Sequence, residues 1–364
     1  MEIVDYVFRV DSSSKIGSGH LMRCLTLARA LRDVGALCSF ICRALEGNLN
    51  HLVVSEGFSL NELAHSRAGA KAAYEGEPYH SYWREVDWKI DAAETLSALS
   101  VLKPRWLVVD HYGLWYDWQV AVASGCKIMV IDDLADRHHH CDLLLDQNLS
   151  SDTLGYQSLI PRDCTTLLGP DYALLRPEFK DYREASLARR VGYGVNNILI
   201  NFGGGDPDNH IAKVLRALLT IDISSNVTIS IIFGGLSKIN EEHKQLISQF
   251  SNTIVSYGMV TNMAELLSVS DLAIGAAGSS SWERCCLGVP SIIFPVALNQ
   301  SGIAEQLSRC GAAIALTNQD LSNGNLGRFV SQILQGQDLT KMSKAAASVC
   351  DGNGLAKIIN IINA

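Results

Sequence analysis

The stretch Val4–Val34, VDYVFRVDSSSKIGSGHLMRCLTLARALRDV, decides the fold of this chain. Its first part, Val4–Val10, is rich in β-branched and aromatic residues and predicts a strand. Its last part, Leu21–Val34, carries apolar residues at helical spacing with Arg and Asp on the opposite face. A polar loop containing glycine joins the two. The stretch therefore predicts a strand, a tight loop and a helix that packs over a sheet.

The same alternation of β-rich runs and helix-like segments continues along the 364 residues. It predicts parallel sheets, and the length suits about two domains. After Arg176-Pro177 the chain turns charged and then glycine-rich over residues 179–196, which indicates a boundary. We predict an α/β protein of two Rossmann-like domains, 1–180 and 193–364, that face a cleft. The later predicted strands are Leu37–Cys42, Trp106–Asp110, Ile128–Asp132, Leu143–Asp146, Asn197–Phe202, Val227–Phe233, Thr253–Tyr257, Leu272–Ala276 and Ser291–Phe294, and Glu46–Lys89 is expected to be irregular.

Composition narrows the classes of partner. A formal net charge of -8 and a pI near 5.7 argue against nucleic acid or an anionic membrane surface as a binding partner, because proteins bind the phosphates of both mainly through Lys and Arg. The longest apolar stretches are far shorter than the roughly 20 residues of a membrane span, and the first residues form no signal-peptide core. We expect a cytoplasmic protein without stable membrane association, whose ten cysteines are buried free thiols.

The loop Gly17-Ser18-Gly19-His20 lies at the start of the first predicted helix. Glycine lets the backbone approach a ligand, and a helix N-terminus favours negative charge. Positive charge is disfavoured there, so His20 is expected to be neutral and able to act as a general base. The alternative is a tight turn in which His20 only caps the helix. The loop is not a dinucleotide fingerprint, because Met22 stands where the third glycine belongs.

Polar residues also follow the predicted strand Trp106–Asp110, where open sheets collect ligand-binding groups. Asp110 and His111, followed by Tyr112, either orient a base, bind sugar hydroxyls or cap the next helix. The tract His138–His140 resembles a metal site, but adjacent histidines cannot all face one ion, and no zinc-type spacing exists. No metal and no cofactor are predicted.

Two glycine-rich loops follow predicted strands in the second half. Gly203 and Gly204 follow one strand. Gly278-Ser279-Ser280-Ser281 follows another and opens a helix, with hydroxyl and N–H donors that suit a diphosphate. Glu283, in that helix, suits the hydroxyls of a ribose, while Asn299 and Gln300 could reach phosphate or sugar. The alternative is ordinary N-capping and a capping-box carboxylate. No P-loop pattern is present.

Several segments together resemble the UDP-2,4-diacetamido-2,4,6-trideoxy-β-L-altropyranose hydrolases of pseudaminic acid biosynthesis. The similarity covers nearly the whole chain in order. A looser resemblance links the chain to the lipid II-forming N-acetylglucosaminyltransferases of the glycosyltransferase-B-like superfamily. The matching segments are Phe8–Ser13, Gly17–Arg23, Asp132–Arg137, Leu168–Phe179 and Gly278–Glu283.

The resemblance implies a metal-independent hydrolase in which His20 activates water at the anomeric carbon. It implies that the helix at Ser279–Ser281 holds the diphosphate, that Glu283 meets the ribose, and that the loop around Met259 meets uracil. The first domain would carry the base and the sugar pocket, and the second would bind UDP. Further substrate contacts are expected from Arg9, Asp11, Gly17, Gly19, Asp110, His111, Tyr112, Arg176, Gly203, Gly204, Gly278, Asn299 and Gln300.

Two other functions fit parts of the same pattern. A glycosyltransferase that uses the same donor would share the diphosphate loop and Glu283, but no Lys/Arg cluster for a lipid acceptor is present around Leu45–Phe58. A non-catalytic nucleotide-sugar-binding protein would lose nothing when His20 is replaced. If the segment Glu46–Lys89 borders the sugar pocket, it could alter which diacetamido sugar is accepted.

Overall fold

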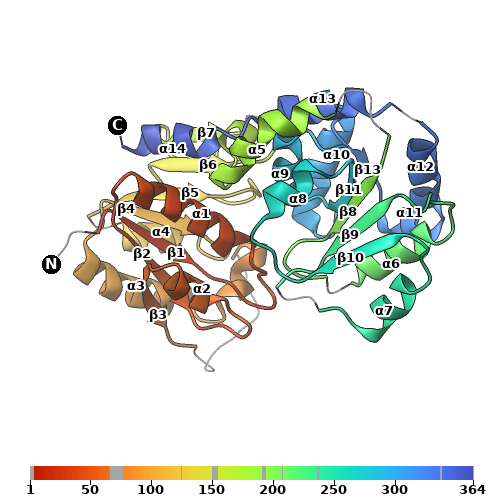
Figure 1. Cartoon of the computed structure of the whole chain (residues 1–364). Coiled ribbons are helices and arrows are strands. Elements are labelled where there is room, and N and C mark those ends of the chain that lie inside the picture. Colours follow the sequence, from red (N-terminus) through yellow and green to blue (C-terminus); the bar gives the residue numbers. More distant parts are fainter. Residues whose placement is uncertain are drawn as a thin grey trace. The chain divides into compact units, whose positions relative to one another are not determined.

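The computed structural model describes residues 4–65, 77–123, 125–149, 155–190, 194–206, 208–235, 238–336 and 338–363. The chain divides into two compact units, each built on one parallel sheet (Figure 1). The first unit takes described residues within Met1–Asn148, Asp152–Leu174 and Leu355–Ala364, and the second takes those within Leu149–Ser151 and Leu175–Gly354.

The first unit has a seven-stranded sheet in the order β3-β2-β1-β4-β5-β6-β7. Side chains alternate along each strand, so Phe8 packs beneath α1 and α14 while Val7 packs toward α3 and α4. The strands are β1 (Tyr6–Val10), β2 (Cys38–Arg43), β3 (Ser59–Leu63), β4 (Trp106–Asp110), β5 (Lys127–Ile131), β6 (Leu143–Asp146) and β7 (Thr165–Leu168). The helices are α1 (Gly19–Asp33), α2 (Asn50–Ser55), α3 (Trp88–Leu102), α4 (Tyr116–Val122) and α14 (Gly354–Ile362), with the 3₁₀ helices η1 (Tyr79–Arg84) and η2 (Pro170–Tyr172).

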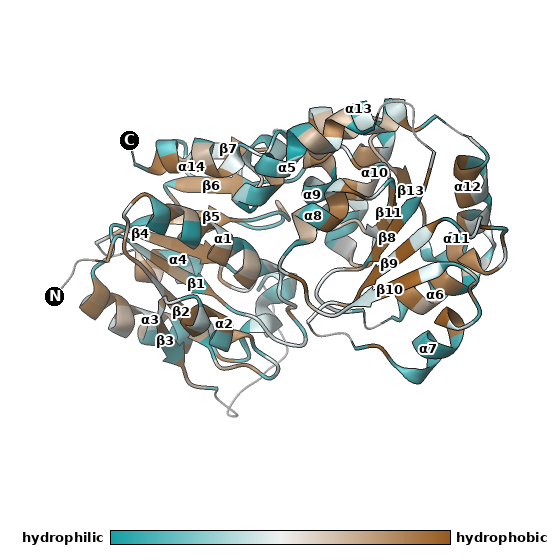
Figure 2. Ribbon diagram, in the orientation of Figure 1, coloured by the Kyte–Doolittle hydropathy of each residue, from teal (hydrophilic) through white to brown (hydrophobic). Residues whose placement is uncertain are grey.

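The second unit has a six-stranded sheet in the order β10-β9-β8-β11-β12-β13, with α6 and α12 packed on one face. Figure 2 shows the central strands of both sheets as mainly hydrophobic, as expected where parallel strands are covered on both faces. The strands are β8 (Asn197–Asn201), β9 (Thr228–Ile232), β10 (Thr253–Tyr257), β11 (Leu272–Ala276), β12 (Ser291–Phe294) and β13 (Ile314–Ala315). The helices are α5 (Pro177–Ala188), α6 (His210–Leu218), α7 (Glu241–Ile247), α8 (Met263–Ser268), α9 (Ser280–Cys286), α10 (Ser301–Arg309), α11 (Asn318–Ser322), α12 (Asn325–Leu334) and α13 (Thr340–Val349), with the 3₁₀ helix η3 (Leu298–Gln300).

The predicted strands all exist, with ends shifted by at most a few residues, but three strands were not predicted. These are β3, β7 and β13, and each lies at an edge of its sheet. An edge strand is covered on fewer sides, so it lacks the apolar run that marks a central strand. The prediction that Glu46–Lys89 is irregular was wrong, since its described residues contain α2, β3, η1 and the start of α3.

The division of the chain also differs from the predicted boundary. The charged residues that suggested a linker belong to α5 and its end, and the arginines among them donate to backbone carbonyls of the second unit. Arg183 binds the carbonyls of Cys350 and Ala347 at 2.9 and 2.8 Å, and Arg190 binds that of Ser270 at 2.7 Å. These carbonyls lie at helix ends and need donors, so the charge marks a helix junction.

The last helix, α14, returns to the first unit instead of staying with the second. Its Leu355, Ile358 and Ile362 are buried in the first core, and the Tyr6 hydroxyl donates to Asn363 Oδ1 at 2.8 Å. All ten cysteines are free; we expected buried thiols, and six of them are buried, whereas Cys310 is exposed. Within the described part of the chain, no helix is long and apolar enough to cross a membrane.

Candidate active site

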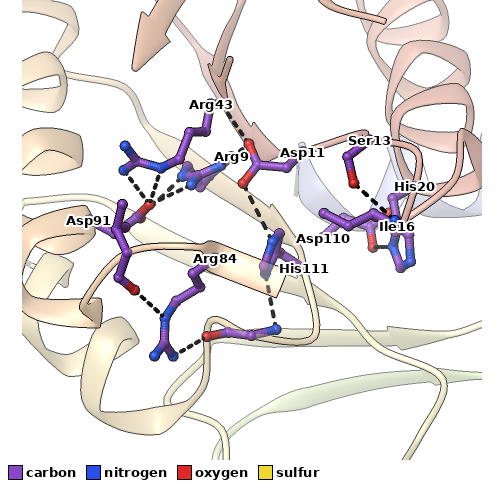
Figure 3. A network of polar contacts seen from close by, with 12 residues as sticks. Arg9, Asp11, Ser13, Ile16, His20, Arg43, Arg84, Asp91, Asp110 and His111 are labelled. Carbon is purple, nitrogen blue, oxygen red and sulfur yellow. Dashed lines mark hydrogen bonds and ion pairs between the residues drawn. The ribbon is translucent and has the colours of Figure 1, made fainter. Parts of the chain in front are cut away.

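His20 and Asp110 meet at the carboxyl edge of the first sheet. β1 and β4 are adjacent, with Val10 opposite Asp110, and the strand order reverses direction between them, as at a ligand-binding switch point. His20 Nδ1 lies 2.6 Å from Asp110 Oδ1 (Figure 3). An ionised carboxylate only accepts, so Nδ1 carries a hydrogen, and in the neutral form of the ring the lone pair lies on Nε2. This pair resembles the base and orienting carboxylate of hydrolytic enzymes.

Arg23 fixes the Asp110 carboxylate from the next turn of α1. Its Nε donates to Oδ2 at 2.6 Å and its Nη2 to Oδ1 at 2.7 Å. Burial alone would raise the pKa of Asp110, but the Arg23 guanidinium and His20 hold it well below its usual range. Arg23 was not among the predicted site residues. Its spacing of i+3 from His20 places both on one helix face, and that signal could have found it.

Tyr112 forms one side of the surroundings of His20. Its ring meets the imidazole edge-on with centroids 4.7 Å apart, and its hydroxyl donates to Asp133. Asp133 also accepts from Arg23 at 3.2 Å. Of the alternatives left open for the residues after β4, the contact between Asp110 and the His20 ring fits best with Asp110 as a residue that orients the imidazole.

Arg9 and Asp11 are fully buried in an ion-pair network and present no surface to a ligand. Arg9 donates to Asp11 at 2.6 Å and to Asp91 at 2.7 Å. Asp91 also binds Arg43 at 2.6 Å, and the backbone N–H of Arg43 donates to Asp11. The predicted substrate contact of Arg9 and Asp11 is therefore not what the structure shows. They join the carboxyl ends of β1 and β2 to α3.

His111 likewise turns away from the site into this network. Its Nδ1 accepts from the Gly113 N–H at 3.0 Å, so Nε2 carries the hydrogen and faces Asp11 Oδ2 at 3.4 Å (Figure 3). Burial lowers the pKa of His111 to about 3, which keeps the ring neutral. A direct substrate contact of His111 is not supported.

The loop before α1 is tight, and its glycines leave space around it. Gly17 has a φ of 82° and its N–H donates to the Ser13 carbonyl at 2.8 Å, a conformation that favours glycine. A Cβ built on Gly17 or Gly19 would meet no described atom within 4 Å. Helix α1 begins at Gly19, as predicted to within two residues.

In the second unit, the glycine loops after β8 and β9 are packed together at the carboxyl edge. Gly203 has a φ of 88°, and a Cβ on Gly234 would lie 2.1 Å from the Gly203 carbonyl oxygen and 2.4 Å from Gly204. Only glycine at position 234 allows this approach. β8 is flanked by β9 and β11, so the loop after β8 and the Gly278–Ser281 loop after β11 share a second switch point.

Arg284 underlies the Gly278–Ser281 loop and was missed from the sequence. It is 4% exposed, and it donates to the Ser280 and Ser281 hydroxyls at 3.2 and 3.0 Å and to the Ala276 carbonyl at 2.6 Å. Among the described residues no carboxylate pairs with it, and burial lowers its pKa to about 10. Because the guanidinium occupies acceptor sites on both hydroxyl oxygens, their O–H bonds must point elsewhere. The loop therefore has a nearby positive charge that the sequence reasoning did not expect.

Glu283 lies in the first turn of α9 and is half-buried. Burial raises its pKa, while Arg176 opposes this change. Arg176 donates to the Thr261 carbonyl at 2.9 Å, so it links α5 to the loop after β10. Among the described residues, no group donates a hydrogen bond to the Glu283 carboxylate, which leaves its two side-chain oxygens available.

The remaining predicted residues lie on neighbouring loops of the same edge. The Gln300 side chain accepts from the Val296 N–H at 3.0 Å, and its Nε2 lies 3.2 Å from a Cβ built on Gly278. Asn299 precedes it in η3. Met259, after β10, is 68% exposed, and its sulfur lies 3.3 Å from a Cβ built on Gly235.

The histidine tract does not form a metal site. His138 is exposed, His139 is buried and faces Gln119 at 3.1 Å, and the His140 ring meets Tyr116. In the parts of the chain that the structure describes, no group of three or more His, Cys, Asp or Glu residues could hold a metal ion.

Comparisons with known proteins agree with this architecture. The structure of Acinetobacter baumannii MurG has a TM-score of 0.69 with this chain at 14% identity, covering 100% of this chain and 99% of that one. Residues 201–360 match the glycosyltransferase family 28 C-terminal domain. The two Rossmann-like units with glycine loops at their switch points thus have the glycosyltransferase-B-like fold.

A curated relative identifies the family within that fold. The UDP-2,4-diacetamido-2,4,6-trideoxy-β-L-altropyranose hydrolase of Campylobacter jejuni is 30% identical over 307 residues, which are 84% of this chain and 96% of the relative. The chain belongs to this hydrolase family, as the resemblance in its sequence indicated. An N-acetylglucosamine transferase of Moorella thermoacetica, which acts on pyrophosphoryl-undecaprenol, is 26% identical over 52% of this chain and 54% of its own length.

Proposed function

We propose that this protein hydrolyses UDP-2,4-diacetamido-2,4,6-trideoxy-β-L-altropyranose at the anomeric C–O bond in pseudaminic acid biosynthesis, in the cytoplasm. The products are UDP and 2,4-diacetamido-2,4,6-trideoxy-L-altrose. The observation that carries the proposal is the 2.6 Å contact between His20 Nδ1 and Asp110, in a chain of this hydrolase family. It gives the chain a base whose other nitrogen is free to take a proton.

In the proposed reaction, His20 Nε2 takes a proton from water as the water oxygen attacks the anomeric carbon. The bond from that carbon to the diphosphate oxygen breaks, and its electron pair stays on UDP. Asp110 stabilises the imidazolium that forms, because its carboxylate faces Nδ1–H. The proton on Nε2 then leaves to solvent and restores the base.

The proposed role of the second unit is to bind the leaving group. Ser279–Ser281 begin α9, where the helix dipole favours an anion. Arg284 adds a full positive charge behind these serines, which supports a diphosphate more strongly than the dipole alone. Glu283 is proposed to accept from the ribose hydroxyls, and the loop with Met259 to meet uracil.

A glycosyltransferase is the second candidate, and one observation favours it. Residues 201–360 match a glycosyltransferase domain, so the nucleotide half alone does not distinguish water from a sugar acceptor. The two candidates differ when no sugar acceptor is present, because a hydrolase would still release UDP and a transferase would not.

The deciding experiment measures release of UDP and free sugar from the purified UDP-sugar, with a chelator and without any acceptor. The wild-type chain, His20→Ala and the control His138→Ala are compared by chromatography and NMR. Release by the wild type and the control, with loss in His20→Ala, supports the hydrolase. UDP binding without release would instead favour the transferase or a non-catalytic binding protein, and only the transferase would release UDP once a sugar acceptor is added. Equal release by His20→Ala and the wild type would refute His20 as the base.

A further inference from the structure

An aromatic cluster from η1 lies beside His20, and neither the predicted site nor the proposed mechanism uses it. The Trp83 ring meets the His20 ring edge-on at 5.6 Å between centroids and stacks on Tyr112 at 4.9 Å with a 27° angle. The His80 ring packs against both Trp83 and Tyr112, at 4.9 and 5.1 Å. Trp83 remains half-exposed, and neighbouring Tyr82 is 42% exposed.

This cluster is held firmly against the loops that carry the base. Arg84, at the end of η1, donates to the Gly113 carbonyl at 2.8 Å and lies over the Trp115 ring at 4.6 Å. A Cβ on Gly113 would approach Arg84 and the η1 backbone to 3.1 and 3.0 Å, so glycine permits this packing. On the other side, Glu85 pairs with Lys15 of the loop before α1 at 2.8 Å.

A half-exposed indole fixed beside a catalytic base offers an apolar surface to a ligand. Aromatic rings bury large areas against C–H groups, and a cluster of exposed aromatics marks a binding surface more often than a single one does. The proposed substrate is unusually rich in methyl groups for a sugar, because it carries a methyl at C6 and on each acetamido group. A hexose with hydroxyls in place of these groups would bury fewer methyl groups against the rings.

We propose that Trp83, stacked on Tyr112, is a specificity-determining residue that contacts the methyl-bearing groups of the sugar and selects a deoxy-acetamido sugar over a hydroxylated one. This inference rests on the proposed function, because it names the part of the substrate that the first unit recognises. The segment expected to be irregular thus supplies a wall of the sugar site.

The test measures binding separately from turnover, in a His20→Asn background that does not consume substrate. Calorimetry gives the Kd of UDP, of the diacetamido-trideoxy UDP-sugar and of UDP-N-acetylglucosamine. Trp83→Ala and Trp83→Gln are expected to weaken the binding of the diacetamido UDP-sugar about ten-fold and to leave the Kd of UDP unchanged. Ten-fold is the lower end of the range for the loss of one apolar contact. Trp83→Phe restores most of the affinity. The preference over UDP-N-acetylglucosamine falls in parallel.

Tyr116→Ala serves as the control, because Tyr116 is a 43% exposed aromatic of α4 in the same unit and contacts His140. It should leave all three affinities unchanged. Thermal unfolding of each variant confirms that it is folded, and the Phe and Gln variants still decide the question if Trp83→Ala is unstable. The proposal would be overturned if the ratio of the two UDP-sugar affinities were the same in the protein that keeps Trp83, in Trp83→Phe and in Trp83→Gln.

The outcomes also separate this inference from the proposed reaction. If the wild type releases no UDP but Trp83→Gln still loses the diacetamido sugar, the wall stands and hydrolysis fails. If the wild type hydrolyses the substrate and the Trp83 variants keep its KM, hydrolysis stands and the wall fails.

Discussion

Replacing Asp110 by Asn should remove the base function of His20 without removing the imidazole. Asp110 Oδ1 accepts from His20 Nδ1 and from Arg23 Nη2, and Oδ2 accepts from Arg23 Nε. Arg23 can only donate, so it competes for the single amide oxygen of Asn. When the amide NH₂ faces His20, Nδ1 must accept, and the hydrogen moves to Nε2. A ring with hydrogen on Nε2 cannot take a proton from water at that atom.

The magnitude follows from the shared function of the pair. Loss of a general base lowers kcat by about 10²–10⁴, or roughly 3–5 kcal/mol in the activation free energy. His20→Asn and Asp110→Asn should each fall in this range. Because both remove the same proton transfer, the double variant should be no slower than His20→Asn, whereas independent effects would multiply to about 10⁴–10⁸.

The assay is UDP release at saturating substrate, with His138→Asn as the matched control for an exposed histidine. Asp110→Asn also loses one charge-assisted hydrogen bond of Arg23, worth about 1.5–3 kcal/mol, so its melting temperature should fall. Rates are therefore measured well below that temperature, and calorimetric binding of UDP serves as a check on the second unit. Multiplicative losses in the double variant would falsify the coupling of the pair.

Three further predictions concern the nucleotide loops and pH. Glu283→Gln should weaken the binding of UDP about ten-fold or more, since a charged hydrogen bond contributes about 1.5–3 kcal/mol. Because burial raises the pKa of Glu283, the affinity of the wild type for UDP should also fall as pH falls. Calorimetry that shows neither change would refute the ribose contact. Arg284→Met removes a buried charge that has no carboxylate partner among the described residues, so thermal unfolding should show unchanged or higher stability, while the affinity for UDP drops about ten-fold. Unchanged affinity for UDP would mean that Arg284 has only a structural role. Burial, with Asp133 nearby, raises the pKa of Asp146 from 3.8 to about 7. Between these pH values the folded state binds more protons than the unfolded state. The free energy of unfolding should therefore fall by at most roughly 4 kcal/mol as pH rises from about 4 to about 7. Denaturant unfolding should show that Asp146→Asn lacks this loss, and parallel pH profiles for both proteins would contradict the assignment.

The sequence alone determined the fold class, most strands and the residues at the ends of central strands. The strand Tyr6–Val10 is buried on both faces and is hydrophobic apart from Arg9, so a central strand of this kind stands out locally. The family resemblance came from loops such as Gly17–Arg23, whose order along the chain needs no knowledge of contacts. His20 followed from its place at a helix start.

Only the tertiary structure decided which of these polar residues face the site. Arg9 and His111 lie at strand ends just as Asp110 does, but long-range partners, Asp91 and Asp11, hold them in the interior. The same holds for Trp83, whose neighbours His20 and Tyr112 are far away in sequence. Sequence patterns report the face and period of an element, whereas charge pairing and ring stacking depend on contacts between elements, and these form only when the sheet brings its strand ends together.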